Sequence, residues 1–214
     1  LASKELELTL TGRDCGQEER APMCGVPFHS YENYVARLIA KGYKVAICEQ
    51  MEDPALAKGL VKRDIIRVVT PGTVIESSML QDDKNNYIAS IYITEKKAGV
   101  CFADVSTGTA HATVLTDEKL GPEIISELCR YSPSEVLFNA AILDYKEVTA
   151  YIKQQLACSV ELLDEAAFAP DACMEEMRAQ FGDAPEKTAG LAPESPAFTA
   201  LAVLLGYLKE TQKK

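Results

Sequence analysis

The most enzyme-like segment of the sequence is Asp104-Val-Ser-Thr-Gly108, in which a carboxylate precedes a hydroxyl-rich turn. A two-metal nuclease needs such a carboxylate late in a central strand, with other acidic groups converging on it to hold Mg²⁺. Among the other candidate acids, only Glu135 falls near the end of a predicted strand. The rest fall on predicted helices or loops, namely Asp117, Glu118, Glu123 and Asp144. Two interpretations stay open: a metal-dependent nuclease centred on Asp104, or an aspartate that shapes the turn before Gly108.

A second candidate site is the loop rich in Gly and Pro over residues 12–27, together with the helix start that follows it. Basic and small polar side chains flank its centre, namely Arg13, Arg20, His29 and Ser30. Positive and small polar groups before a helix N-terminus form a surface suited to phosphate, because the first backbone N–H groups of the helix point outward. The loop is therefore a candidate phosphate-binding surface.

The net charge of −10 argues against a nucleic-acid partner when the chain is taken as a whole. The charge is uneven, since residues 1–74 carry 10 basic and 10 acidic side chains, and the rest carries 12 and 22. Phosphate contact is thus expected only in the first third, where Lys58, Lys62 and Arg63 form a second basic cluster or an ordinary solvated turn. The acidic remainder suits protein partners, so a pure protein-interaction module is a third interpretation.

Other site chemistries find little support in the sequence. It contains no G-x-x-x-x-G-K-[ST], no G-x-S-x-G and no H-E-x-x-H. The seven cysteines are odd in number and form no C-x-x-C, and the two histidines have no cysteine at ligand spacing. We therefore expect reduced thiols in a cytoplasmic protein and no metal site. No apolar run is long enough for a bilayer-spanning helix, and a chain that begins with Leu1 favours an internal fragment.

The hydrophobic pattern predicts an α/β protein whose first part is a small mixed α+β domain over residues 1–76. Alternation over 6–11 predicts a strand, and Ser30 is expected to cap a helix that ends near Lys41, before Gly42. Further elements are a strand at 43–48, a helical turn opening at 53–54 and a strand at 65–70. Residues 77–86 have the composition of a linker.

The second part, residues 87–214, is predicted to form a ribonuclease-H-like α/β domain. Three strands at 87–94, 99–105 and 109–115 are separated by short turns and form a meander. Helices and strands then alternate, at 122–131, 135–138, 145–156 and 159–163. Helices over 171–180 and 196–212 complete the chain, and the last one is expected to lead into a further domain.

Three segments carry a resemblance to a known family. They are 22–34 (Pro-Met-Cys-Gly-Val-Pro-Phe-His-Ser-Tyr-Glu-Asn-Tyr), 45–54 (Val-Ala-Ile-Cys-Glu-Gln-Met-Glu-Asp-Pro) and 67–73 (Arg-Val-Val-Thr-Pro-Gly-Thr). In this order and spacing they resemble the DNA mismatch repair family MutS, and residues 11–13 and 104–108 fit as well. The resemblance covers nearly the whole chain and is strongest over 1–75.

The resemblance implies a mismatch-recognition domain followed by a connector domain with a ribonuclease-H-like fold. MutS proteins are dimeric clamps that scan duplex DNA, and a Phe from a Phe-x-Glu motif wedges beside the mispair from the minor groove. Such a wedge unstacks bases at a cost of a few kcal/mol, which is smallest where pairing is already defective. The connector links recognition to the ATPase and to MutL. ATP and Mg²⁺ are implied for the full-length homodimer, and no cofactor is implied for the segment matched here.

Four residues take DNA-facing roles by this resemblance. Arg13 would contact the backbone near the mispair, Met23 would lie close to the distorted step, and His29 and Ser30 would contact phosphate. The alternatives are that Met23 belongs to the core and that His29 caps its own helix.

The sequence departs from the family in two respects. It contains no Phe-x-Glu, and it ends before the lever, clamp and ATPase regions. We therefore expect a truncated recognition domain with an intact connector, non-catalytic and weak in duplex binding.

Overall fold

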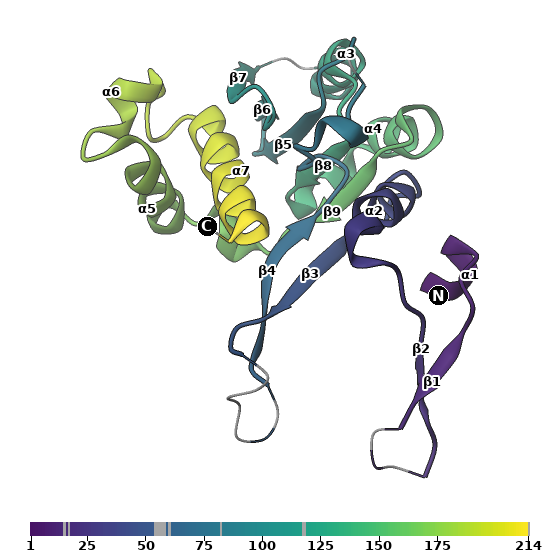
Figure 1. The fold of residues 1–214 in the computed structure, drawn as a ribbon. Helices are drawn as coiled ribbons and strands as arrows, with labels where there is room; N and C mark the ends of the chain where they lie inside the picture. The colour runs from purple at the N-terminus through teal and green to yellow at the C-terminus, as the bar shows by residue number, and fades with distance from the viewer. Residues whose placement is uncertain are drawn as a thin grey trace.

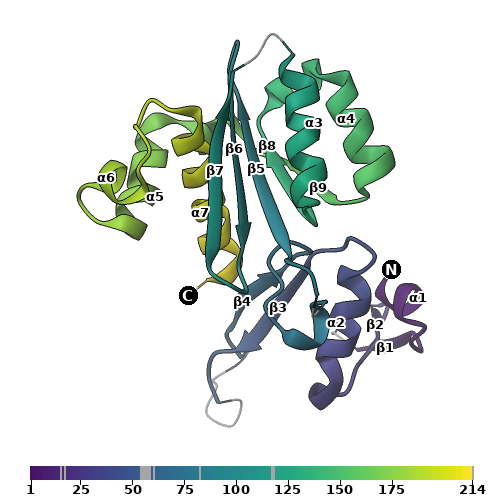
Figure 2. The same ribbon diagram turned by 90° about the horizontal axis from the view of Figure 1, so that it is seen from above.

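The computed structural model of the chain describes residues 1–14, 16, 18–53, 59, 61–81, 83–116 and 119–213. These residues form two units (Figures 1 and 2). The N-terminal unit contains the elements from α1 to β4, and the C-terminal unit contains those from β5 to α7. A single 3-10 turn, η2 (Ser77–Met79), lies between them.

The N-terminal unit begins with a short helix, so the predicted strand over residues 6–11 is wrong. Helix α1 (Ala2–Leu6) ends where Glu7 adopts a left-handed conformation with φ of 58°. Its sequence, Ala-Ser-Lys-Glu-Leu, consists mostly of good helix formers, and Leu6 is its one buried residue. The Lys41 ammonium group holds this helix against the next one through a 2.7 Å ion pair with Glu5.

The predicted loop over residues 12–27 contains a short antiparallel hairpin. Strand β1 (Thr11–Arg13) pairs with β2 (Ala21–Met23), with Gly12 opposite Pro22. Each strand has only three residues, which is too few for an alternating hydrophobic pattern to predict a strand. The hairpin leads through the 3-10 turn η1 (Phe28–Ser30) into helix α2 (Tyr31–Ile39).

The core of the N-terminal unit is small. Helix α2 buries Val35 and Ile39 against Val69 and Val74. Strands β3 (Val45–Gln50) and β4 (Arg63–Val69) form a second antiparallel hairpin. The helix ends two residues earlier than predicted, before Gly42, whose φ is 80°. The helical turn predicted from 53–54 onward falls largely on 54–58, outside the described residues.

The C-terminal unit is built on one five-stranded sheet. Its strands are β5 (Tyr87–Ile93), β6 (Ala98–Asp104), β7 (Thr109–Leu115), β8 (Glu135–Phe138) and β9 (Ser159–Leu162). Their order in space is β7-β6-β5-β8-β9; β5, β6 and β7 are antiparallel, and β8 is parallel to both β5 and β9. The predicted α/β class is confirmed, and the order agrees with a three-stranded meander extended by helix-connected strands.

Helices cover both faces of this sheet, as Figure 2 shows. On one face lie α3 (Leu120–Tyr131) and α4 (Lys146–Tyr151), which continues through the π turn η4 (Ile152–Leu156). On the other lie α5 (Pro170–Phe181) and α7 (Pro196–Gln212). Three short elements were not predicted: η3 (Ala140–Asp144), η5 (Glu165–Phe168) and α6 (Pro185–Ala189).

Helix α7 lies unusually close to the sheet. A Cβ atom at Gly99 of β6 would stand 1.9 Å from the carbonyl oxygen of Pro196, so only glycine fits there. The helix buries residues around most of its circumference from Ala197 to Leu204. Even so, among the described residues no helix has the length and apolar character needed to cross a membrane.

Candidate nucleic-acid interface

The hairpin β1–β2 brings Arg13 and Met23 onto one face. Thr11 stands opposite Met23 and Arg13 opposite Ala21, so these four side chains project to the same side of the ribbon. The Thr11 hydroxyl donates a 2.9 Å hydrogen bond to the Met23 carbonyl oxygen and fixes this register. Met23 is 46% exposed, so the alternative that it belongs to the core is wrong.

The structure places His29 and Ser30 in η1, directly before α2. Ser30 occupies the N-cap position, but its hydroxyl donates a 3.3 Å hydrogen bond to the Pro27 carbonyl oxygen. The predicted side-chain cap is therefore not formed, because a cap must accept a bond from the helix rather than donate one away from it. The imidazole of His29 is exposed beside this turn. Both residues thus lie where an anion could meet the start of α2.

Phe28 is a surface residue that sequence reasoning missed. Its side chain is 85% exposed, and its ring stacks on Tyr31 with centroids 6.1 Å apart. An exposed aromatic ring can stack on a base or pack on a sugar, which contributes to nucleic-acid binding without sequence preference. The signal was present in the sequence as an aromatic residue in a polar loop, between Pro27 and His29, immediately before a helix.

The two pairs of predicted residues are neighbours along the chain. The hydrogen bonds of Ser30 run to Pro27, not to the hairpin. His29 lies six positions after Met23 along the chain, which limits the distance between their Cα atoms to about 20 Å. That span corresponds to roughly 6 base pairs of a duplex at about 3.4 Å per pair. One stretch of DNA could therefore reach both pairs.

The charges around this surface are mixed. Arg13 and Arg20 are exposed on the first hairpin, and they share it with acidic side chains, which are Asp14, Glu18 and Glu19. Lys62 and Arg63 are exposed where the second hairpin enters β4, whereas Lys58 lies outside the described residues. In Figure 1 both hairpins reach away from the five-stranded sheet in the same direction. Four basic groups of the molecule's first third, Arg13, Arg20, Lys62 and Arg63, thus lie on the projecting hairpins, beside a larger number of acidic side chains among the described residues.

Comparison of the sequence with protein families shows which family the chain belongs to. Residues 1–78 match the family model for MutS domain I, and residues 86–214 match that for MutS domain II. The chain belongs to the MutS family. The resemblance carried by residues 22–34, 45–54 and 67–73 is thereby confirmed.

Curated relatives extend the MutS match over the whole chain. The DNA mismatch repair protein MutS of Ruminiclostridium cellulolyticum is 47% identical over 213 residues, covering 100% of this chain. The proteins of the same name from Acetivibrio thermocellus and Clostridium tetani are each 46% identical, over 217 and 212 residues. The chain spans only 24% of the first two relatives and 23% of the third. It thus corresponds to MutS domains I and II rather than to a whole relative.

In this MutS chain, Asp104 shapes a turn. Its carboxylate is 1% exposed. One oxygen accepts bonds from the Ser106 backbone N–H at 2.9 Å and hydroxyl at 2.6 Å, and the other accepts from the Asn85 amide at 2.8 Å. Burial alone would raise the pKa of Asp104, but these hydrogen bonds outweigh it and hold the pKa below its usual value. All the donors come from the turn and from the segment preceding β5.

The nuclease interpretation of Asp104 is not supported by this geometry. Within the described ranges, no three His, Cys, Asp or Glu side chains gather in a group that could hold a metal ion. Two of the acids considered, Asp117 and Glu118, lie outside those ranges. The chain also contains no phosphate-binding loop of the G-x-x-x-x-G-K-[ST] type.

Proposed function

We propose that this chain is the DNA-recognition and connector portion of a mismatch-repair protein, and that it binds duplex DNA without catalysing a reaction. The observation that carries the proposal is that Met23 and Phe28 are exposed, as is Arg13 on the same hairpin face as Met23, in a segment that matches MutS domain I. An arginine, a flexible apolar side chain and an aromatic ring suit a DNA backbone beside a distorted step. His29 and Ser30 would add contacts to phosphate.

We expect this binding to be weak and sensitive to salt. Four exposed cations are available on the two hairpins, namely Arg13, Arg20, Lys62 and Arg63. If about three of them neutralise phosphates, log K falls against log salt with a slope of about −3, or roughly 50-fold between 50 and 200 mM. The sequence contains no Phe-x-Glu motif. Matched and mismatched duplexes are therefore expected to bind alike.

Fluorescence anisotropy with two labelled duplexes tests this proposal. One duplex is fully paired, the other carries a G·T mispair, and both are titrated at several salt concentrations. Equal, weak and salt-steep binding supports it. A clear preference for the mispair would show that Arg13, Met23 and the start of α2 discriminate without a wedge. Complete absence of binding would instead favour a protein-interaction module, as the acidic charge of the chain suggests.

For the C-terminal unit we propose the connector role, in which it links the recognition unit to the ATPase of the full-length cytoplasmic homodimer and to MutL. Its excess of acidic side chains, 22 against 12 basic ones beyond residue 74, suits a protein partner better than a duplex. A MutL binding assay on the chain with and without residues 87–214 checks this role. Comparable MutL affinity after the deletion would contradict it.

A further inference from the structure

A buried carboxylate joins the two units. Glu135 opens β8 in the C-terminal unit, and its side chain is 0% exposed. From the N-terminal unit it accepts hydrogen bonds from the Thr70 hydroxyl and, at 3.0 Å, from the Gly72 backbone N–H. From α7 it accepts a 2.7 Å bond from the Tyr207 hydroxyl. Three segments far apart in the sequence therefore meet at one side chain.

Lys44 brings a compensating charge to this carboxylate from the N-terminal unit. Its ammonium group lies 3.7 Å from Glu135, donates a 3.0 Å bond to the Tyr207 hydroxyl and pairs with Glu161 of β9. It also lies 5.3 Å from the centroid of the Tyr207 ring. Burial, followed by the negative charge of Glu135, raises the pKa of Tyr207, so this hydroxyl remains a donor at neutral pH. We call Lys44, Thr70, Gly72, Glu135 and Tyr207 the Glu135 joint.

The chain at Gly72 packs against the sheet with no room to spare. A Cβ atom at this position would lie 2.8 Å from the Cβ atoms of both Glu135 and Ile88. Real Cβ contacts essentially never fall that short, so any larger residue would have to push the turn away from β5 and β8. The joint thus combines a charged anchor with close backbone packing.

Burying a carboxylate costs free energy unless its oxygens accept hydrogen bonds, so a buried carboxylate at position 135 needs a structural reason. An apolar residue would serve the β8 core equally well, but it could not bind a hydroxyl and a backbone N–H of the neighbouring unit. We propose that Glu135 is a positioning residue that fixes the orientation of the N-terminal unit on the five-stranded sheet. On the proposed function, this joint makes the connector follow any displacement of the DNA-facing surface.

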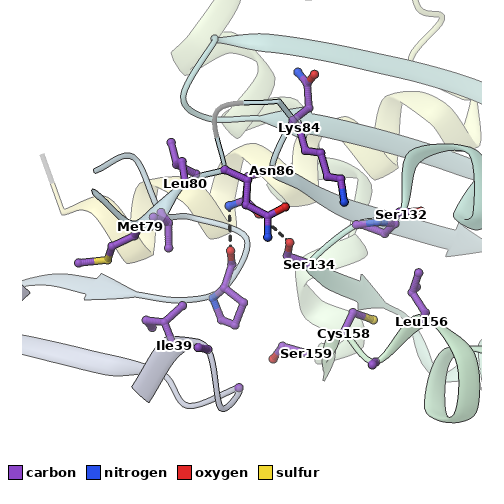
Figure 3. A pocket seen from close by; sticks show the side chains of 18 of the residues that line it. Ile39, Met79, Leu80, Lys84, Asn86, Ser132, Ser134, Leu156, Cys158 and Ser159 are labelled. Atoms are coloured by element: carbon purple, nitrogen blue, oxygen red, sulfur yellow. Dashed lines mark hydrogen bonds between the residues drawn. The ribbon is translucent and has the colours of Figure 1, made fainter. Parts of the chain in front are cut away.

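A cleft of about 470 Å³ lies between the two units, next to the joint at Pro71. It is lined from both units, by Ile39 on one side and by Ser134 and Cys158 on the other (Figure 3). Asn86 spans it, since its amide donates a 2.9 Å bond to the Pro71 carbonyl oxygen and accepts a 2.6 Å bond from the Ser134 hydroxyl. Loosening of the joint would open this cleft to reagents.

The half-buried thiol of Cys158 is a natural probe of that opening. We would follow alkylation of the native full chain by N-ethylmaleimide and quantify each cysteine peptide by mass spectrometry. Cys101, buried in β6, reports in the same spectra on whether the sheet remains folded. The assay needs no DNA, so its failure is distinguishable from failure of the proposed function.

Two substitutions in the N-terminal unit perturb the joint without changing its charge. Thr70→Val removes one donor to the carboxylate at nearly constant volume, and Gly72→Ala inserts a methyl group between the units. Thr70→Val should raise the alkylation rate of Cys158 by on the order of 10-fold, as expected for loss of one hydrogen bond to a charged group, while Cys101 stays protected. Gly72→Ala should raise it comparably, because the methyl group pushes the turn away from β5 and β8. Lys209→Met is the matched control, because it breaks a 3.1 Å ion pair to Glu176 inside the C-terminal unit. It should leave both rates unchanged.

Glu135→Gln is used only together with Thr70→Val. On its own it would also change the pKa of the Cys158 thiol, which burial, and to a smaller extent the Glu135 charge, raises, and with it the alkylation rate. Thr70→Val on the Glu135→Gln background should add less than it does alone, since Glu135→Gln removes the charge that strengthens the bond from the Thr70 hydroxyl. The proposal is overturned if Thr70→Val and Gly72→Ala leave Cys158 within about two-fold of wild type. It is equally overturned if Cys101 becomes reactive in step with Cys158, because the joint would then support the sheet itself rather than an orientation.

Discussion

Gly99→Ala tests how closely α7 packs on the sheet. The added Cβ would stand 1.9 Å from the Pro196 carbonyl oxygen, 2.0 Å from its carbonyl carbon and 2.4 Å from the Ala197 nitrogen. Since optimal carbon contacts lie at about 3.5–4.0 Å, the start of α7 would have to move by roughly 2 Å. All three obstructing atoms belong to the backbone, so no side-chain rotation can relieve the clash.

The magnitude follows from what this movement disrupts. Overpacking a core costs about 1–3 kcal/mol, and a backbone obstacle beneath the most buried helix of the C-terminal unit places Gly99→Ala near the upper end. A chain of this size loses about 2–4 °C of melting temperature per kcal/mol. We therefore expect Tm to fall by roughly 6–12 °C.

Thermal unfolding followed by circular dichroism at pH 7 measures this shift. Gly25→Ala is the matched control, because its added Cβ would have no atom within 4 Å and its backbone conformation suits any residue. That variant should melt within about 2 °C of wild type. If Gly99→Ala does the same, α7 can lift from β6 at little cost, and the close-packing argument is refuted.

Three further predictions concern the DNA-facing surface and Asp104. Arg13→Gln should weaken matched and mismatched duplexes alike and make the salt slope shallower by about 1, whereas Arg130→Gln, an exposed arginine on α3, should change neither. An unchanged slope would remove Arg13 from the interface. Phe28→Ala should lower duplex affinity by roughly 5- to 100-fold at constant Tm, because the ring is exposed; a parallel fall in Tm would mean that it supports the fold instead. Since the pKa of Asp104 is lower in the folded chain than in the unfolded one, its contribution to stability is present above about pH 4 and is lost as the pH falls further. Urea unfolding should accordingly show a weaker dependence on pH below this point for Asp104→Asn, and identical profiles for both proteins would contradict the hydrogen-bonding argument.

The elements of the C-terminal unit could be predicted within a few residues, because its central strands β5, β6 and β8 are almost continuously buried runs. Strand β8 agrees with its predicted bounds, and every residue of β6 is buried. The N-terminal unit was harder. Leucines alternate over 6–11, but Leu6 closes a helix whose contacts come from α2, and β1 and β2 are too short for any periodicity.

The candidate site shows a similar division. The resemblance to the family indicated four candidate residues, Arg13, Met23, His29 and Ser30, and their roles at DNA stay predictions. The exposure of Arg13, Met23 and His29 had to come from the fold, as did that of Phe28. The Glu135 joint could not be predicted from local sequence, because the groups that donate hydrogen bonds to its carboxylate lie 63 to 72 residues away along the chain. A sequence pattern shows only an acidic residue at the start of an apolar strand.

The small core of the N-terminal unit has a consequence for its dynamics. Four buried residues, Val35, Ile39, Val69 and Val74, hold it together, whereas the sheet of the C-terminal unit is sandwiched between two much larger clusters. Cooperative opening requires less free energy where less apolar surface is buried. Backbone amides of α2, β3 and β4 should therefore exchange with deuterium through a sub-global opening that leaves β5, β6 and β8 protected. The N-terminal unit would then behave as a separate foldon, one that can open and rearrange while the neighbouring sheet keeps its shape.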